Sequence, residues 1–310
     1  MRNSGFLHIS CLILATCALA TACGSSRAKP VAIHVDSLAL VDAKSNEVIA
    51  DVPVGRDPTR VAYGQGAFWV VSPEAGVVFR VDAKTKRATR FRIGEDPFDA
   101  AVGAGALWVP DHDGQRLLRF DLDSHEIRAT RSFGLPAISV GFGFGSVWVA
   151  VADGSVLRIE PRTLRTTATI RDATTTIEGS EPKLAFAHGS VWISSPAESN
   201  VARIDPERGT VQRQPLVEAV GISAGAGAVW VADNANAVWR FGGSKPQKIR
   251  VGAQPRDVAA STKSVWVANS GDQALVRLDP ASRRVVASVK LHHHPIAVAA
   301  GSGVVAVAIP

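Results

Sequence analysis

Cysteine is scarce in this chain, and all of it lies at one end. The 310 residues include three cysteines, Cys11, Cys17 and Cys23, and none follows them. A folded region without cysteine has no internal disulfide and no thiolate metal site. Its stability must therefore come from a packed core, which 46% hydrophobic residues can supply.

Charge is also sparse, at 20% of residues, with 34 Lys and Arg against 28 Asp and Glu. The basic residues are scattered and are not interleaved with aromatic residues, so we expect no nucleic-acid partner. The small positive excess mildly favours anionic neighbours such as lipid head groups or wall polymers. Low-complexity segments are absent, which predicts one continuous folded domain.

Tryptophan, by contrast, recurs regularly. Successive residues of the series are 36 to 44 positions apart, close to the roughly 40-residue length of a propeller blade. Each is followed by Val or Ile, and we interpret all six as core residues between blades. The series consists of Trp69, Trp108, Trp148, Trp192, Trp230 and Trp266.

Each repeat contains four short apolar runs separated by turn residues. In one repeat these runs are 255–259, 266–269, 276–280 and 285–291. Runs of about five residues that are rich in Val and Ile and bounded by Gly, Pro, Asn and Asp predict strands. The pattern favours four-stranded antiparallel blades and excludes helical solenoids.

The two ends of the repeat region predict how the ring closes. The chain has seven strand pairs of each of two types, and it opens with an unmatched pair at 38–54 and closes with another at 295–309. Together they complete one blade and hide exposed strand edges. We therefore predict an all-β, seven-bladed propeller over residues 35–310. Ala306 stands where other blades have Trp, so we expect this blade to be the most weakly packed.

The N-terminus predicts export. Arg2 precedes an apolar stretch at 6–19 that is too short to span a bilayer, which is typical of a signal peptide and places it at residues 1–22. Residues 19–24, Leu-Ala-Thr-Ala-Cys-Gly, resemble the lipobox of bacterial lipoproteins, although Ala20 stands where Leu is usual. The same residues also suit an ordinary signal peptidase.

We expect the lipid on Cys23, with residues 23–34 as a lipidated N-terminus and short tether. This would anchor the protein to the membrane. The address would be the periplasmic side of the outer membrane in a Gram-negative organism, and the outer face of the cell membrane in a Gram-positive or mycobacterial one.

Two repeats carry a family resemblance. Trp230-Val-Ala-Asp and Trp266-Val-Ala-Asn, each followed by a Val-x-Arg-x-Asp-like strand, resemble bacterial YVTN-type and streptogramin-lyase-like propellers, and the likeness covers about residues 37–310. Because these motifs build blades, they imply the fold more than the function.

The resemblance to streptogramin lyases also implies a histidine directly after the proline of the first-strand phrase, with a glutamate nearby. Here the corresponding positions hold Thr59, Phe98, Ala137, Lys183, Arg256 and Ile296. The expected general base is missing, so we predict no catalytic residue. A lyase or hydrolase that uses the central channel remains the alternative, because Glu181 and the channel charges are present.

Function is expected where the repeats differ. Nine residues before each Trp, at the mouth of the central channel, the chain carries Arg60, Asp99, Ser139, Lys183, Gly221 and Asp257, with Ala297 in the blade without Trp. The four charged residues, Arg60, Asp99, Lys183 and Asp257, are our predicted site for a ligand or partner. The alternative is a channel mouth that is simply polar and wet.

Loops on the same face are predicted as secondary binding elements, because rigid scaffolds usually bind through loops. The residues are Asp111, His112, Asp113, Asp233 and Asn269, and the longest Trp-to-Trp step adds a Thr-rich loop at 172–181. The competing interpretation is that Asp and Asn here only form turns.

A repeated arginine lies two residues before an acidic turn residue, for example Arg80 before Asp82, and predicts local ion pairs. His292, His293 and His294 alternate in direction along an extended segment, so we expect no metal site and no cofactor. The sequence predicts a monomeric, non-catalytic binding or scaffold protein of the cell envelope, whose partner is an envelope protein or wall polymer.

Overall fold

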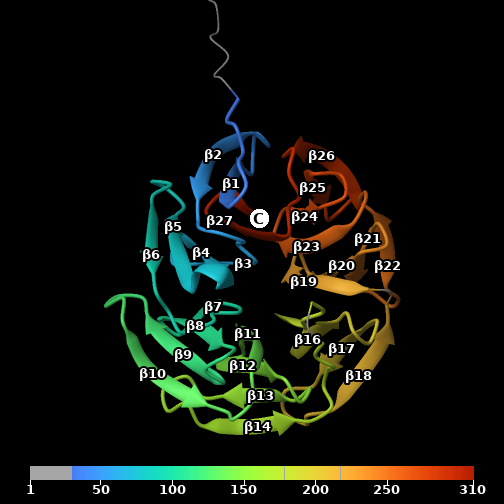
Figure 1. The fold of residues 1–310 in the computed structure, drawn as a ribbon. Helices are drawn as coiled ribbons and strands as arrows, with labels where there is room; N and C mark the ends of the chain where they lie inside the picture. The colour runs from blue at the N-terminus through green and yellow to red at the C-terminus, as the bar shows by residue number, and fades with distance from the viewer. Residues whose placement is uncertain (1–29, 178, 217) are drawn as a thin grey trace, which may run out of the picture. The chain divides into compact units, whose positions relative to one another are not determined.

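Seven four-stranded antiparallel sheets form a closed ring, which confirms the predicted seven-bladed propeller (Figure 1). The computed structural model describes residues 30–177, 179–216 and 218–310. The predicted signal peptide at 1–22 and Cys23 lie outside the described residues. Within that described part, no helix has the length and apolar character needed to cross a membrane.

The first three blades follow one another in the chain. Blade 1 contains β3 (Arg60–Gly64), β4 (Ala67–Ser72), β5 (Val77–Asp82) and β6 (Ala88–Phe91), with the short 3-10 helix η1 (Pro73–Ala75). Blade 2 contains β7 (Ala101–Gly103), β8 (Ala106–Asp111), β9 (Arg116–Asp121) and β10 (Ile127–Ser132). Blade 3 contains β11 (Ala137–Gly143), β12 (Ser146–Val151), β13 (Val156–Ile159) and β14 (Thr166–Ile170).

The next three blades repeat this order. Blade 4 contains β15 (Lys183–Ala187), β16 (Ser190–Ser195), β17 (Asn200–Ile204) and β18 (Val211–Pro215). Blade 5 contains β19 (Ala219–Gly225), β20 (Ala228–Asp233), β21 (Ala237–Phe241) and β22 (Gln247–Arg250). Blade 6 contains β23 (Pro255–Ala260), β24 (Val265–Asn269), β25 (Ala274–Asp279) and β26 (Arg284–Lys290).

Blade 7 closes the ring with strands from both ends of the chain, as predicted. It contains β27 (Ala297–Gly301), β28 (Val304–Ile309), β1 (Ser37–Asp42) and β2 (Val48–Pro53). β1 pairs antiparallel with β28, from Ser37 opposite Ile309 to Asp42 opposite Val304. Figure 1 shows the blue strands β1 and β2 completing the sheet of the red strand β27. The backbone groups of the two terminal strand pairs are thereby satisfied within one sheet.

The repeated tryptophans form the cores between blades. Five are at most 1% exposed, and their rings lie in apolar clusters that combine residues of neighbouring blades. Trp192 is the exception to the prediction, because it is only partly buried and lines a cavity of about 420 Å³ with Phe241 and Arg203.

The repeated arginines mostly do not form the predicted local ion pairs. Only Arg80 does so, with its guanidinium 3.5 Å from Asp82. Each of these arginines lies directly opposite a repeated Trp on the neighbouring strand, for example Arg158 opposite Trp148. In blades 2 to 6 the guanidinium carbon is 5.4 to 6.0 Å from the centre of that Trp ring, a cation–π arrangement. The Arg therefore packs against the Trp ring. The prediction of local ion pairs, which rested on a spacing of two residues in the sequence, was wrong for the repeated arginines other than Arg80.

The acidic turn residues bond to backbone instead. Asp82, for example, accepts hydrogen bonds from the N–H groups of Lys84 and Thr85 at 3.1 and 2.8 Å. The backbone N–H of Thr85 is the largest cause that holds the pKa of Asp82 below its usual value. The same turn recurs between the third and fourth strands of other blades, so these carboxylates shape one face of the ring, which we call the turn face.

Candidate functional site: the channel mouth

The first strands of the blades surround a polar cavity of about 260 Å³ on the ring axis. Arg60, Asp99, Lys183 and Asp257, the four charged residues predicted from the repeat, all line it. A second cavity of about 570 Å³ lies among the loops and shares Arg60 and Lys183 with the first. These two cations therefore stand where the channel meets its mouth, and we call the surrounding loop surface the mouth face.

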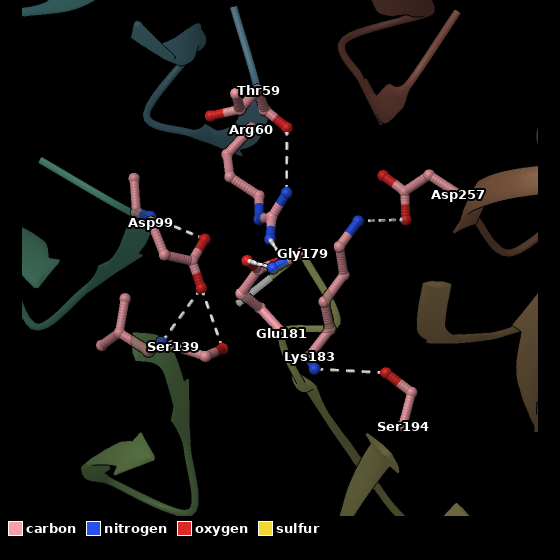
Figure 2. Close-up of polar contacts among 11 residues, drawn as sticks. Thr59, Arg60, Asp99, Ser139, Gly179, Glu181, Lys183, Ser194 and Asp257 are labelled. Carbon is pink, nitrogen blue, oxygen red and sulfur yellow. Dashed lines mark hydrogen bonds and ion pairs between the residues drawn. The ribbon is translucent and has the colours of Figure 1, made fainter. Parts of the chain in front are cut away.

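Arg60 pairs with a carboxylate from a loop across the channel. Its guanidinium lies 3.7 Å from Glu181, and both side chains are only 19% exposed. Glu181 belongs to the loop between β14 and β15, the longest insertion in the repeat. Figure 2 shows Arg60 and Glu181 facing one another between Asp99 and Lys183.

That loop is tied to the scaffold by its threonines. The Thr174 and Ser195 hydroxyls lie 2.9 Å apart in the interior, and the Thr176 hydroxyl donates to the carbonyl of Ala152 at 2.7 Å. The Thr-rich composition of 172–181 thus serves to fix the loop. Glu181 itself accepts the backbone N–H of Gly179 at 2.8 Å.

Lys183 and Asp257 form the second ion pair of the channel. The Lys183 ammonium lies 2.9 Å from the Asp257 carboxylate, with side chains 16% and 10% exposed. Burial lowers the pKa of Lys183, while the charge of Asp257 opposes that change and Arg60 adds to it. The amine is therefore easier to deprotonate than an ordinary lysine.

The two channel aspartates also join neighbouring blades. Asp99 accepts hydrogen bonds from the Ser139 hydroxyl at 2.9 Å and from the backbone N–H of Val140 at 3.0 Å, both in the next blade. Asp257 likewise accepts the backbone N–H of Val298 at 3.0 Å. Buried backbone N–H groups need such partners. Asp99 and Asp257 consequently hold the ring together as well as line the channel.

The uncharged positions of the channel series differ from one another. Ser139 and Gly221 each follow a β-bulge, which re-aims the next side chain. A Cβ on Gly221 would lie 2.6 Å from the Cα of Asp257, so close packing of blades 5 and 6 demands glycine there. Ala297 leaves blade 7 without a polar group at this level.

Three of the predicted loop residues are buried at the ends of strands β8, β20 and β24. Asp111 accepts the N–H groups of Glu95 and Asp96 and the guanidinium of Arg116. Asp233 accepts the indole N–H of Trp239 at 2.8 Å, and Asn269 donates to the carbonyl of Val251. These contacts join neighbouring loops and strands, so the three side chains have a structural role.

His112 and Asp113 lie elsewhere on the mouth face, in the loop between β8 and β9. The His112 Nδ1 is 3.2 Å from Asp113 and 3.6 Å from Asp96, a residue that the sequence did not single out. His292, His293 and His294 do not converge: His293 contacts the carbonyl of Ile33, whereas His294 contacts the carbonyl of Ser270. The structure thus separates these groups from the channel pairs.

Comparisons with known proteins identify similar folds and do not assign an activity. No family model matches this sequence. No curated protein matches it either.

Among solved structures, the propeller is similar to streptogramin B lyase, with a TM-score of 0.69 at 14% identity over 82% of this chain and 93% of that one. It is also similar to Kuenenia stuttgartiensis hydrazine synthase, with a TM-score of 0.63 at 13% identity over 78% and 89%. U3-55K gives a TM-score of 0.66 at 11% identity over 80% and 86%. Because the identities are this low, the likenesses concern the fold alone. They establish that the chain has a streptogramin-lyase-like propeller fold.

Proposed function

We propose that this protein is an exported, lipid-anchored propeller of the cell envelope that binds a partner protein through its mouth face, with no chemistry of its own. The observation that carries the proposal is the presence of two ion pairs in the channel: Arg60 with Glu181, both partly buried, and Lys183 with Asp257, which is more deeply buried. Removing charges from water costs several kcal/mol per ion, and mutual attraction often fails to offset it.

The fold does not require the cations of Arg60 and Lys183, whereas Asp257 also joins two blades. At the equivalent position, blades 3, 5 and 7 have Ser139, Gly221 and Ala297, and the ring closes with them equally well. Cations that the scaffold can omit, yet that are partly buried at a channel mouth, favour recognition of a polar group. Arg60 and Lys183 offer donors and Glu181 offers an acceptor, which suits a partner segment bearing both kinds of group.

The anchoring part of the proposal rests on the sequence. Signal cleavage after residue 22 would leave Cys23 as the first residue, where acylation would consume the chain's one remaining thiol. Mass spectrometry of the N-terminal peptide tests this: a diacylglyceryl or triacyl Cys23 supports it, and an unmodified Cys23 contradicts it. A Cys23→Ser variant should then appear in the soluble fraction.

The binding part is tested by cross-linking and capture from the native envelope. The wild type should capture a partner that the Arg60→Gln/Glu181→Gln double variant loses. Glutamine is isosteric with Glu181 and somewhat smaller than Arg60, and the double change removes both charges together, so neither is left unpaired. Asp99 and Asp257 are unsuitable for this test because they join blades. Equal capture by both forms would contradict a site at the channel mouth. Capture of a wall polymer would mean that the partner is a polymer and not a protein.

A lyase or hydrolase is the second candidate, favoured by one observation. Lys183 lines the channel, and burial lowers the pKa of its amine, so its ammonium releases a proton more readily than that of an ordinary lysine. Streptogramin B is a rational first substrate because of the fold likeness. Turnover that Lys183→Met abolishes would support this candidate over binding alone, and absence of turnover in the folded wild type would remove it.

A further inference from the structure

Three potential metal ligands converge on the mouth face of blade 2, away from the channel. Asp96 comes from the loop between β6 and β7, whereas His112 and Asp113 come from the loop between β8 and β9. One donor atom from each of the three residues lies within 4.8 Å of the other two. Two separate loops thus bring an imidazole and two carboxylates together.

Two of the three distances match those between ligands around one small ion, and the third, between Asp96 and Asp113, is at most 4.8 Å. Metal–ligand bonds of about 2.0–2.1 Å in a tetrahedral zinc site place neighbouring ligand atoms roughly 3.4 Å apart. The His112 Nδ1 lies 3.2 Å from Asp113 Oδ1 and 3.6 Å from Asp96 Oδ2. An ion can therefore bridge all three groups with only small side-chain adjustments.

The imidazole is held in place before any ion binds. His112 stacks on Phe98 with ring centres 5.2 Å apart and planes 27° from parallel. Its backbone N–H donates to the carbonyl of Asp96 at 2.9 Å, and the Phe98 N–H donates to Pro110 at 3.0 Å. These bonds tie the two loops to each other, so little ordering remains to be done on binding.

The cluster also lacks cationic charge. The nearby guanidinium of Arg116 is occupied by Asp111 at 2.7 Å and Glu95 at 3.1 Å. Among the described residues, His112 is the only basic group within ion-pair distance of Asp96 or Asp113.

We propose that Asp96, His112 and Asp113 form a binding site for one divalent transition-metal ion of the zinc class. The imidazole ligand favours such ions over Mg²⁺ and Ca²⁺, which prefer all-oxygen sites. Three protein ligands leave a fourth position for water or for a donor atom from a partner. This site shares no residue with the channel ion pairs, so its test is separate from the test of the proposed function.

The test is Zn²⁺ titration of the exported chain by calorimetry, after chelator treatment, with Co²⁺ absorption to report coordination. We expect one Zn²⁺ per chain, weakened at least tenfold by His112→Ala and by Asp96→Asn. His188→Asn is the matched control, because His188 is an exposed turn histidine that lies outside the cluster. It should bind Zn²⁺ as the wild type does.

Two results would overturn the site. The first is undiminished Zn²⁺ binding by folded His112→Ala, which would locate binding elsewhere, for example at His292–His294. The second is the absence of stoichiometric binding by the folded wild type. Circular dichroism of each variant verifies the fold, and Mg²⁺ titration, expected to give binding at least tenfold weaker than Zn²⁺, tests the ion class.

Discussion

The two faces of the ring are built on opposite principles. On the turn face, Asp82, Asp121, Asp205 and Asp279 repeat the same bonds from carboxylate to backbone N–H. On the mouth face, the position nine residues before each Trp is Arg, Asp, Ser, Lys or Gly, and the equivalent position of blade 7 is Ala297. The repeated positions shape the turns of most blades, and the varied positions form the proposed recognition surface.

The largest expected effect sharpens the scaffold side of this contrast. Trp148→Ala should lower the free energy of unfolding by about 3–5 kcal/mol, because it removes a fully buried ring and leaves a cavity. Trp192→Ala is the comparison variant and should cost less, since that ring is partly exposed. Urea denaturation measures both. Equal losses would contradict the distinction between the two tryptophans.

The next effect concerns Asp257, which lines the channel and also joins two blades. Asp257→Ala strands the Lys183 charge and the Val298 N–H, and should cost about 3 kcal/mol or more of unfolding free energy. Adding Lys183→Met should recover part of that loss by removing the stranded charge. If the double variant is no more stable than Asp257→Ala, the ion pair does not explain the cost.

A smaller effect on stability is expected on the mouth face. The Arg60→Gln/Glu181→Gln variant removes a single long ion pair of 3.7 Å, which should change the unfolding free energy by about 1 kcal/mol or less. Its thermal midpoint should stay close to that of the wild type while partner capture falls. A large drop in the midpoint would make these residues part of the scaffold.

The turn face predicts a weak acid dependence. Backbone hydrogen bonds hold the pKa values of Asp121, Asp205 and other turn aspartates below the usual 3.8. The folded state then binds fewer protons than the unfolded state, so this contribution is complete above pH 3.8 and is lost as the pH falls through the lowered values.

Thermal midpoints measured from pH 6 downward should decline more steeply in the wild type than in Asp121→Asn/Asp205→Asn. An unchanged slope in that variant would show that these turns do not contribute. Arg60→Gln/Glu181→Gln serves as the mouth-face control. Its thermal midpoints should decline with pH as in the wild type, because the lowered pKa values belong to carboxylates of the turn face.

The sequence predicted the ring well because a buried Trp in each blade imposes a visible period. It also placed Arg60, Asp99, Lys183 and Asp257 around one channel, since equivalent positions in a ring face the axis. The partners of these side chains could not be predicted. Glu181 reaches Arg60 through a long loop, and Asp99 bonds to the next blade, so both contacts depend on three-dimensional geometry.

Two other features escaped sequence reasoning for a similar reason. The partner of the repeated Arg is the Trp on the neighbouring strand, a relation set by strand register and hidden by distance along the chain. Asp96 joins His112 only because two successive loops bond to each other. Spacing along one strand predicts shared faces, but it does not reveal such cross-strand and cross-loop contacts.

The most direct test of the account places a photo-cross-linking residue on each face in turn. Ile177 is 56% exposed on the mouth-face loop, and Arg208 is exposed in a turn of blade 4. In the native envelope, the probe at Ile177 should join the chain to a partner that the probe at Arg208 does not reach. Capture from Arg208 with none from Ile177 would contradict recognition through the mouth face.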